Sequence, residues 1–272
     1  MPEIAEVETV RNTLKKRLLN KRIVDVKILY PQMMESNVDE FKKNIVNQEF
    51  VDIKRRGKWL IFELDNYYLI SHLRMEGKYF IKEHDEEINK HEHVIFKLDD
   101  GYDLRYHDTR KFGRMRLITK DMLDTCEEIQ KQGYEPMDDK LTGEYLLSKF
   151  KNKRLPIKTV LLDQTIISGL GNIYADEVLF KSQINPLRTA ASITLDEANK
   201  IITSSKSIIE MAIKLGGTTI RSYTSSLGVT GHYQDYLCVH KQENKPCPNC
   251  GTLIKRIKVN GRSTYYCENC QK

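Results

Sequence analysis

Two pairs of cysteines near the carboxyl end have the residue type and the spacing of a metal site. The segments CPNC and CENC place Cys247, Cys250, Cys267 and Cys270 in a C-x2-C pattern that repeats after sixteen residues. Each pair can chelate one metal ion, and two pairs form the closed four-thiolate site typical of structural zinc. A disulfide pair or a redox dithiol is the alternative. Because cysteine would fill all four positions on the metal, we expect one structural Zn²⁺ that carries out no chemistry.

The segment between the cysteine pairs is predicted to form a β-hairpin. Asn260-Gly261 is the preferred dipeptide of a type I′ turn, and the residues on both sides alternate in polarity. This hairpin would present Arg262 at its tip. Residues 241–272 contain seven basic and two acidic residues, which accounts for nearly all of the net charge of +6. Such clustering is expected of a nucleic-acid-binding surface, although a solvated basic tail has the same composition.

The first residues, MPEIAEVET, allow two interpretations. In the first they begin a helix, because proline and early glutamates suit a helix start, and apolar residues at helical spacing predict a helix over roughly residues 3–19. In the second, removal of Met1 leaves Pro2 as the amino terminus, a secondary amine beside the Glu3 carboxylate. That group would be an amine nucleophile. These residues alone favour the first interpretation without excluding the second.

Two internal segments could bind an anion, but each has an ordinary structural explanation. In LDQTIISGLGNIYADEVLF, Gly169, Gly171 and Asn172 lie between two helical patterns, so amides at a helix start could face a phosphate. A short loop between helices would use the same glycines. In IKRRGKWL, basic residues that include Lys58 surround Gly57. A cluster of this kind lies more often on a solvated face than in a site.

The patterning divides the chain of 272 residues into three regions, and this length allows two domains with their own cores. Up to about residue 120, short β-rich runs separated by turn residues predict a β-sandwich or barrel. From residue 121 to about 215 the pattern is helical, with a capping box at Thr194–Glu197. Cys126 and Cys238 stand alone and are expected to be inert thiols. Since no apolar run approaches the length of a membrane span and no signal-peptide core is present, we expect a cytoplasmic protein.

Several separated motifs also stand in a characteristic order: PEIAEVET, RRGKWL, SHLRMEGKY, RKFG and GLGNIYADE, followed by the four-cysteine finger. In these motifs the chain resembles the formamidopyrimidine-DNA glycosylase family over essentially its whole length. One departure is Ala5, where the family usually has proline. The resemblance implies an α+β multidomain fold. Residues 1–120 would form a catalytic β-sandwich with an N-terminal helix, 121–235 a helix–two-turn–helix DNA-binding domain with a lesion-binding loop, and 236–272 a zinc-finger β-hairpin.

The resemblance implies a base-excision repair enzyme that removes oxidised purines, such as 8-oxoguanine and formamidopyrimidines, and then cleaves the abasic site by β,δ-elimination. Pro2 would attack the deoxyribose C1′ and form a Schiff base, which suits a terminal amine with a pKa near 8, against about 10.4 for lysine. Glu3 would donate and shuttle protons, and Lys58 would assist base release and β-elimination. Arg262 would act in δ-elimination while binding phosphate. The partner would be damaged double-stranded DNA, and the protein a nucleoid-associated monomer without a membrane anchor.

The same resemblance identifies DNA-binding residues. A base must leave the stack before its sugar can be attacked, and Met75, Arg110 and Phe112 would fill the space it leaves. The contacts to DNA phosphates would come from His91, Arg154, Asn172 and Arg262. Lys158 would add a weaker phosphate contact. Main-chain amides in a flexible loop would read the everted purine, at Thr219, Ile220, Arg221, Ser222 and Tyr223.

Two other functions remain as alternatives. An endonuclease VIII-type glycosylase would prefer oxidised pyrimidines, but the set of Met75, Arg110 and Phe112 and the long loop after Gly216 argue against it. A zinc-containing DNA-binding protein without catalysis would require Pro2 to be blocked or still preceded by Met1.

Overall fold

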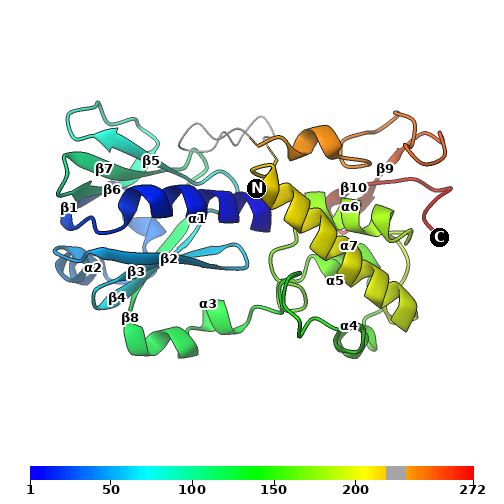
Figure 1. The fold of residues 1–272 in the computed structure, drawn as a ribbon. Helices are drawn as coiled ribbons and strands as arrows, with labels where there is room; N and C mark the ends of the chain where they lie inside the picture. Colours follow the sequence, from blue (N-terminus) through cyan, green and yellow to red (C-terminus); the bar gives the residue numbers. More distant parts are fainter. Residues whose placement is uncertain (219–230) are drawn as a thin grey trace. The chain divides into compact units, whose positions relative to one another are not determined.

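The computed structural model describes residues 1–218 and 231–272 and divides them into two compact units (Figure 1). The first unit comprises Met1–Gln130 together with Thr218 and Gly231, and the second comprises Lys131–Gly217 and His232–Lys272. Within the described residues, no helix combines the length and the apolar character needed to cross a membrane.

Two four-stranded antiparallel sheets form the first unit and pack as the predicted sandwich (Figure 1). Their strand orders are β1-β6-β7-β5 and β2-β3-β4-β8. The strands are β1 (Ile23–Ile28), β2 (Phe50–Arg56), β3 (Trp59–Leu64), β4 (Tyr67–His72), β5 (Lys78–Glu83), β6 (Glu92–Leu98), β7 (Tyr102–His107) and β8 (Arg114–Thr119). The helical segments are α1 (Ile4–Leu18), η1 (Pro31–Met33), α2 (Val38–Ile45), η2 (Lys120–Thr125) and α3 (Glu127–Gln130).

One apolar core fills the space between the two sheets and α1. The helix buries the predicted stripe from Val7 to Leu18 against strand residues of both sheets. Phe62 of β3 and Tyr79 of β5 meet edge to face in this core, with 5.4 Å between ring centroids, so an aromatic contact joins the sheets. α1 is thereby fixed on the sandwich, and the residues that precede it are held in place.

The sequence patterns miss three elements of this unit. β2 is mostly polar, since only Phe50 and Ile53 are buried along its length. β8 alternates without a clear apolar face. The short helix α2 begins at an N-cap residue, Asn37, whose side chain accepts from the main-chain N–H groups of Asp39 and Glu40. In each element, tertiary pairing or capping outweighs a weak local pattern.

A fully buried arginine organises the connection between β5 and β6. Arg105 is 0% exposed and pairs with Asp103 at 2.9 Å and Glu92 at 3.1 Å. Its guanidinium also donates to three carbonyl oxygens of the connection, those of Glu83, Glu86 and Glu87. Because both carboxylates and the guanidinium are satisfied, the network fixes a polar loop without leaving a buried charge unpaired.

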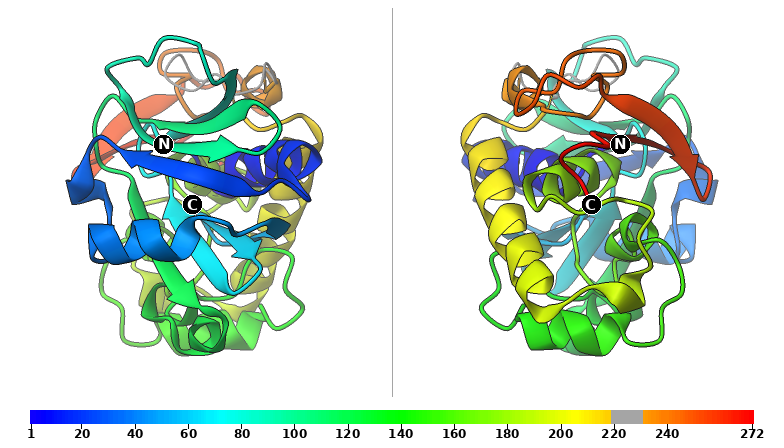
Figure 2. Two further views of the ribbon diagram at one scale, coloured as in Figure 1. Left: turned by 90° about the vertical axis from the view of Figure 1, so that its left-hand side faces the viewer. Right: turned by 90° about the vertical axis from the view of Figure 1, so that its right-hand side faces the viewer.

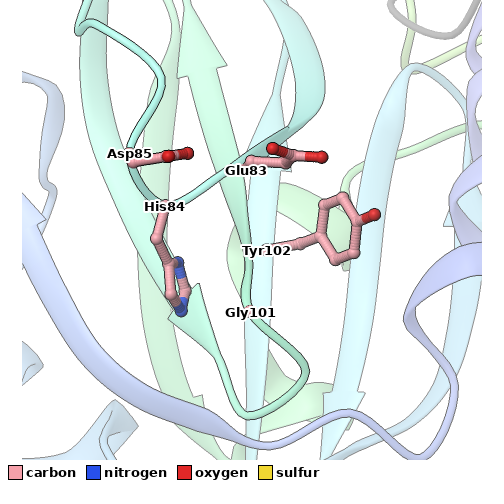
Figure 3. Close-up of a pocket in the computed structure, with 5 residues that line it drawn as sticks. All are labelled: Glu83, His84, Asp85, Gly101 and Tyr102. Atoms are coloured by element: carbon pink, nitrogen blue, oxygen red, sulfur yellow. The ribbon is translucent and has the colours of Figure 1, made fainter.

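A shallow depression of about 310 Å³ lies beside this connection (Figure 3). Figure 3 shows the His84 imidazole directed away from the carboxylates of Glu83 and Asp85. Its Nδ1 lies 2.6 Å from Asp103 Oδ1. The lining residues are Glu83, His84, Asp85, Gly101 and Tyr102. Two acidic groups would repel a phosphate, and no residue predicted for the functional site lines this depression.

The second unit combines helices with the predicted hairpin. Its elements are α4 (Gly143–Phe150), α5 (Ile157–Leu161), α6 (Asn172–Lys181), η3 (Ala190–Ser192), α7 (Leu195–Lys214), η4 (Tyr233–Tyr236), β9 (Lys255–Val259) and β10 (Arg262–Tyr266). The capping box of Thr194 and Glu197 begins α7 as predicted. α4 and α6 both contact α7, and β10 contacts α6 (Figure 2). Asn260 and Gly261 have φ values of +43° and +77°, which confirms the type I′ turn.

Candidate functional site

Two glutamates, Glu3 and Glu6, form a capping box at the start of α1. Glu3 is the N-cap residue, and its main-chain N–H donates to Glu6 Oε2 at 2.9 Å. Pro2 is buried and Glu3 is 2% exposed. Burial lowers the pKa of the Met1 amino group below its usual value, although the carboxylates of Glu3 and Glu6 act in the opposite sense. An amine at this helix start therefore loses its proton more readily than one in water.

Glu6 also holds a segment far along the chain. Its Oε1 accepts from the main-chain N–H of Thr218 at 2.7 Å and from Thr218 Oγ1 at 3.0 Å. One carboxylate thus joins the helix start to the last described residue before the predicted lesion-binding loop. Sequence reasoning missed this link because the partners are 212 residues apart. The predicted loop residues Thr219, Ile220, Arg221, Ser222 and Tyr223 lie outside the described residues.

Lys58 occupies the two-residue turn between β2 and β3 and is 5% exposed. Gly57 precedes it with φ +55°, a conformation that glycine adopts without strain. Arg55 braces the turn, because one guanidinium N–H donates to Gly57 O at 2.9 Å and Nε donates to Glu8 Oε2 at 2.7 Å. Although burial acts to raise the pKa of Glu8, hydrogen bonds from arginine hold it below its usual value. The Glu8–Arg55 pair therefore ties the Lys58 turn to α1.

Met75 lies half-buried in the turn that follows β4. The preceding residue, Arg74, has φ +53°, and its main-chain N–H donates to His72 Nδ1 at 2.9 Å. Burial, with the positive charges of Arg74 and Lys58, lowers the pKa of His72 to about 3. The neutral imidazole can therefore accept this hydrogen bond near pH 7. His72 also packs edge to face on Trp59, with 4.7 Å between ring centroids.

Arg110 and Phe112 are exposed in the loop between β7 and β8, with Arg110 Cζ 4.8 Å from the Phe112 ring centroid. Tyr106 supports this loop and the Met75 turn together. A Cβ on Gly77 would lie 2.1 Å from Tyr106 Oη, and one on Gly113 would lie 1.8 Å from it. Only glycine fits at these close approaches. The structure thus brings the three predicted void-filling residues onto two turns that rest on one buried tyrosine.

His91 lies half-buried just before β6, where its ring is 5.5 Å from that of His107. Its carbonyl oxygen accepts from the main-chain N–H of Asp108 at 2.9 Å. The start of β6, which carries His91, is therefore tied to the loop that carries Arg110.

In the second unit, α6 begins at Asn172 after Gly171 as N-cap, as the glycine pattern predicts. Asn172 Nδ2 donates to Ser263 O at 2.9 Å, and Lys158 Nζ donates to the same oxygen at 2.9 Å. Lys158 is 1% exposed and also pairs with Asp176 at 2.7 Å. It therefore supports the hairpin next to Arg262, in place of the phosphate contact expected of it.

Glu177 ends the GLGNIYADE motif, and the sequence pattern alone indicates no role for it. Its carboxylate accepts from the main-chain N–H groups of Cys238, Val239 and His240 at 2.9, 3.0 and 2.8 Å. His240 also binds Asp176 through Nδ1 at 2.7 Å. Adjacent acidic residues of α6 thus hold the segment that leads to the cysteine finger.

The four predicted cysteine ligands converge, with their sulfur atoms within 4.8 Å of one another. The Sγ atoms of Cys247 and Cys270 are 3.9 Å apart, and those of Cys250 and Cys267 are 3.5 Å apart. Tetrahedral zinc with Zn–S bonds of about 2.3 Å requires sulfur separations of about 3.8 Å. The donor set therefore fits one structural zinc ion, which would hold the hairpin.

The remaining predicted residues are placed simply. Arg262 at the hairpin tip and Arg154 before α5 are both exposed. Burial raises the pKa of the Cys126 and Cys238 thiols to about 11, so both are poor nucleophiles at neutral pH.

The low pKa of His72 predicts acid sensitivity of the first unit. The unfolded state, with a pKa near 6.5, binds the proton at higher pH than the folded state, so stability falls as the pH decreases from about 6.5 towards 3. The free energy of unfolding should drop by about 2 kcal/mol from this group between pH 7 and pH 5. His72→Asn, which keeps an acceptor for Arg74, should lose this component. Urea unfolding followed by the fluorescence of Trp59, the single tryptophan, measures it; equal pH dependence in both proteins would contradict the assignment.

Zinc removal should affect the hairpin alone. Cys247→Ala, or a strong chelator, should release about one zinc per chain and make residues 245–272 susceptible to protease. The urea midpoint reported by Trp59 should stay unchanged, because this residue lies in the first unit. A native protein with much less than one zinc per chain would exclude the four-thiolate site.

Comparison with known proteins agrees with this geometry. Models of the formamidopyrimidine-DNA glycosylase N-terminal domain, its H2TH domain, and a zinc finger found in FPG and IleRS match residues 1–115, 132–224 and 244–272. A formamidopyrimidine-DNA glycosylase of Bacillus cereus is 43% identical over 273 residues, which cover 100% of this chain and 99% of the relative.

Solved structures of Lactococcus lactis Fpg are similar over the full length. A mutant bound to Fapy-dG-containing DNA has a TM-score of 0.95 at 39% identity, and the wild-type protein bound to DNA with an oxidised pyrimidine has a TM-score of 0.93 at 39% identity. Both matches cover 100% of each chain. Because sequence, domain order and fold all agree from end to end, the chain belongs to the formamidopyrimidine-DNA glycosylase family.

Proposed function

We propose that Pro2, after removal of Met1, is the nucleophile of this base-excision repair glycosylase. The start of α1 carries the proposal: Pro2 is buried directly before a capped helix, beside Glu3, where burial lowers the pKa of the Met1 amino group. The same surroundings would leave a useful fraction of a proline amine uncharged at neutral pH, and only an uncharged amine can attack. Attack on C1′ of the damaged nucleotide breaks the glycosidic bond. Because proline is a secondary amine, the product is a cationic iminium.

Three further residues would complete the reaction. Glu3, held by Glu6 at the helix start, would give a proton to the opening sugar and shuttle it in later steps. Lys58, fixed in the braced turn, would assist departure of the base and β-elimination. Its charge acts on the Met1 amino group, which supports its place near the nucleophile. Arg262, at the tip of the zinc-held hairpin, would bind phosphate and act in δ-elimination.

The proposed substrate is an oxidised purine in duplex DNA. Met75, Arg110 and Phe112 support it, since they lie on two turns whose glycines, Gly77 and Gly113, both approach Tyr106 closely, and Arg110 stacks on Phe112. The Lactococcus lactis relative in complex with Fapy-dG-containing DNA also supports a purine lesion. An oxidised pyrimidine is the second candidate, because that relative has also been solved with such DNA.

The phosphate contacts would come from His91, Arg154, Asn172 and Arg262. The everted purine would bind main-chain amides at Thr219, Ile220, Arg221, Ser222 and Tyr223. We further propose that the protein acts as a monomer in the cytoplasm, on nucleoid DNA. The three regions 1–120, 121–235 and 236–272 would supply the catalytic, helical DNA-binding and zinc-finger functions.

Borohydride should trap a covalent DNA adduct on an N-terminal peptide that begins at Pro2. Reduction converts the iminium to a stable amine, so the site of attachment can be read by mass spectrometry. Pro2→Gly, or one residue added before Pro2, should severely reduce trapping on an 8-oxoguanine duplex.

One residue added after Lys272 is the matched control and should trap normally. Full trapping by the N-terminally extended protein would contradict the proposal that Pro2 is the nucleophile. Faster single-turnover excision from an oxidised-pyrimidine duplex than from an 8-oxoguanine duplex would favour the endonuclease VIII-type alternative.

Arg110 should set the preference for the base opposite the lesion. Its guanidinium has only donors, which suit the adjacent O2 and N3 acceptors of cytosine, whereas adenine presents an amino group beside N1. The mismatch should cost about 1 to 3 kcal/mol, or roughly 5- to 150-fold in preference for cytosine. Arg110→Ala should lose most of this preference. Single-turnover excision on the two duplexes measures it, and an unchanged ratio would make Arg110 a phosphate or packing residue.

A further inference from the structure

One buried carboxylate holds the β7–β8 loop from inside. Asp108 is 0% exposed, its Oδ1 accepts from the main-chain N–H of Arg110 at 2.9 Å, and its Oδ2 accepts from those of Phe112 and Gly113 at 2.9 and 2.8 Å. These three donors belong to the short segment between β7, which ends at His107, and β8, which begins at Arg114. Asp108 therefore replaces the hydrogen bonds that a strand would provide.

The main chain of Asp108 is equally fixed. Its N–H donates to His91 O at 2.9 Å, and its carbonyl oxygen accepts from His93 Nε2 at 2.7 Å. Because His91 directly precedes β6 and His93 lies in it, the carboxylate has a defined position on the sandwich. The β7–β8 loop is thus anchored to β6 through Asp108.

The conformation of the β7–β8 loop separates the side chain of Lys111 from those of Arg110 and Phe112. Lys111 has φ +57°, and its Nζ lies 4.8 Å from the centroid of the Tyr30 ring. Arg110 and Phe112 instead stack on each other at 4.8 Å. The two side chains that the proposed function assigns to the DNA gap are therefore placed before any DNA binds, which reduces the entropy lost on binding.

We propose that Asp108 is the positioning residue for recognition of the opposite strand. The carboxylate holds the main chain of Arg110, Phe112 and Gly113, and through them it fixes the guanidinium that distinguishes cytosine from adenine. This inference rests on the proposed function of Arg110. Asp108 touches neither the substrate nor the reacting atoms, so its effect appears in discrimination between opposite bases.

Asp108→Asn tests the carboxylate with almost no change of shape. An amide has one acceptor oxygen, and its NH₂ group would face either Arg110 N–H or the N–H groups of Phe112 and Gly113. At least one main-chain donor would lose its partner in either orientation. The loop should then sample other conformations, and the guanidinium should no longer be held against cytosine.

The experiment measures single-turnover excision of 8-oxoguanine opposite cytosine and opposite adenine. Asp108→Asn should lower the cytosine-to-adenine ratio by about fivefold or more. In an Arg110→Ala background the same substitution should leave the ratio unchanged, because it acts through Arg110. A wild-type ratio in Asp108→Asn overturns the inference. An unchanged ratio in Arg110→Ala alone overturns the proposed role of Arg110 instead, so the two failures are distinguishable.

Asp103→Asn is the matched control. Asp103 is also buried, at 2% exposure, but its carboxylate binds the side chains of Arg105 and His84. It should cost stability while leaving the opposite-base ratio at the wild-type value. A comparable fall in the ratio for this variant would show that general destabilisation, and not the Asp108 contacts, sets the effect.

A measurement on the wild-type protein keeps the inference testable if Asp108→Asn does not fold. The amides of Arg110, Phe112 and Gly113 should be protected from hydrogen exchange in the DNA-free protein, although Arg110 and Phe112 have exposed side chains. Exchange of these amides at the rate of an open loop would overturn the proposed positioning role.

Discussion

Hydrogen bonds from main-chain N–H groups to buried carboxyl groups are the interaction on which the proposed functional segments depend. Glu6 binds Glu3 and Thr218, Asp108 binds the loop of Arg110, and Glu177 binds the segment before the cysteine finger. Each carboxylate accepts at least two hydrogen bonds, so main-chain donors that lack a helix or strand partner are satisfied. Each carboxyl group also needs its loop, since a buried polar group without hydrogen-bond partners is strongly unfavourable. The segments that carry the residues proposed for catalysis and recognition are thus fixed without belonging to a sheet.

The cysteine finger illustrates how a small element is held by more than its metal. Zinc would fix the cysteine pairs, but the hairpin strand next to Arg262 is also bound by Lys158 and Asn172 through the carbonyl of Ser263. The buried ammonium of Lys158 thus contacts both the Asp176 carboxylate and the Ser263 carbonyl oxygen. A metal alone would set the shape of the finger, whereas these contacts set its orientation on α6.

Local patterns account for the parts that were predicted correctly from the sequence. The stripe of α1, the spacing of the cysteines, the Asn260-Gly261 turn and the apolar strands each depend on neighbouring residues in the chain. The elements that were missed, β2, β8 and α2, depend on pairing or capping that their composition does not reveal.

The supporting side chains were missed for a related reason. Glu6 meets Thr218, and Lys158 meets Ser263, over long stretches of chain that no local pattern spans. The resemblance implies a weaker phosphate contact for Lys158, but the side chain is buried and pairs with Asp176, and lysine is rarely buried without such a partner. The cysteine ligands follow from their spacing, whereas the roles of the other site residues come from the family motifs and stay predictions.

The contact of Tyr106 with Gly77 and Gly113 has an evolutionary consequence. Gly113 could acquire a side chain only if residue 106 became smaller, which would remove support from both turns, and at Gly77 a Cβ would in addition lie 2.6 Å from the main-chain oxygen of Leu73. A lineage could not pass through such changes one at a time without a destabilised intermediate. Substitution of Tyr106 therefore affects the Met75 turn and the Arg110 loop together, which couples the two turns through one side chain.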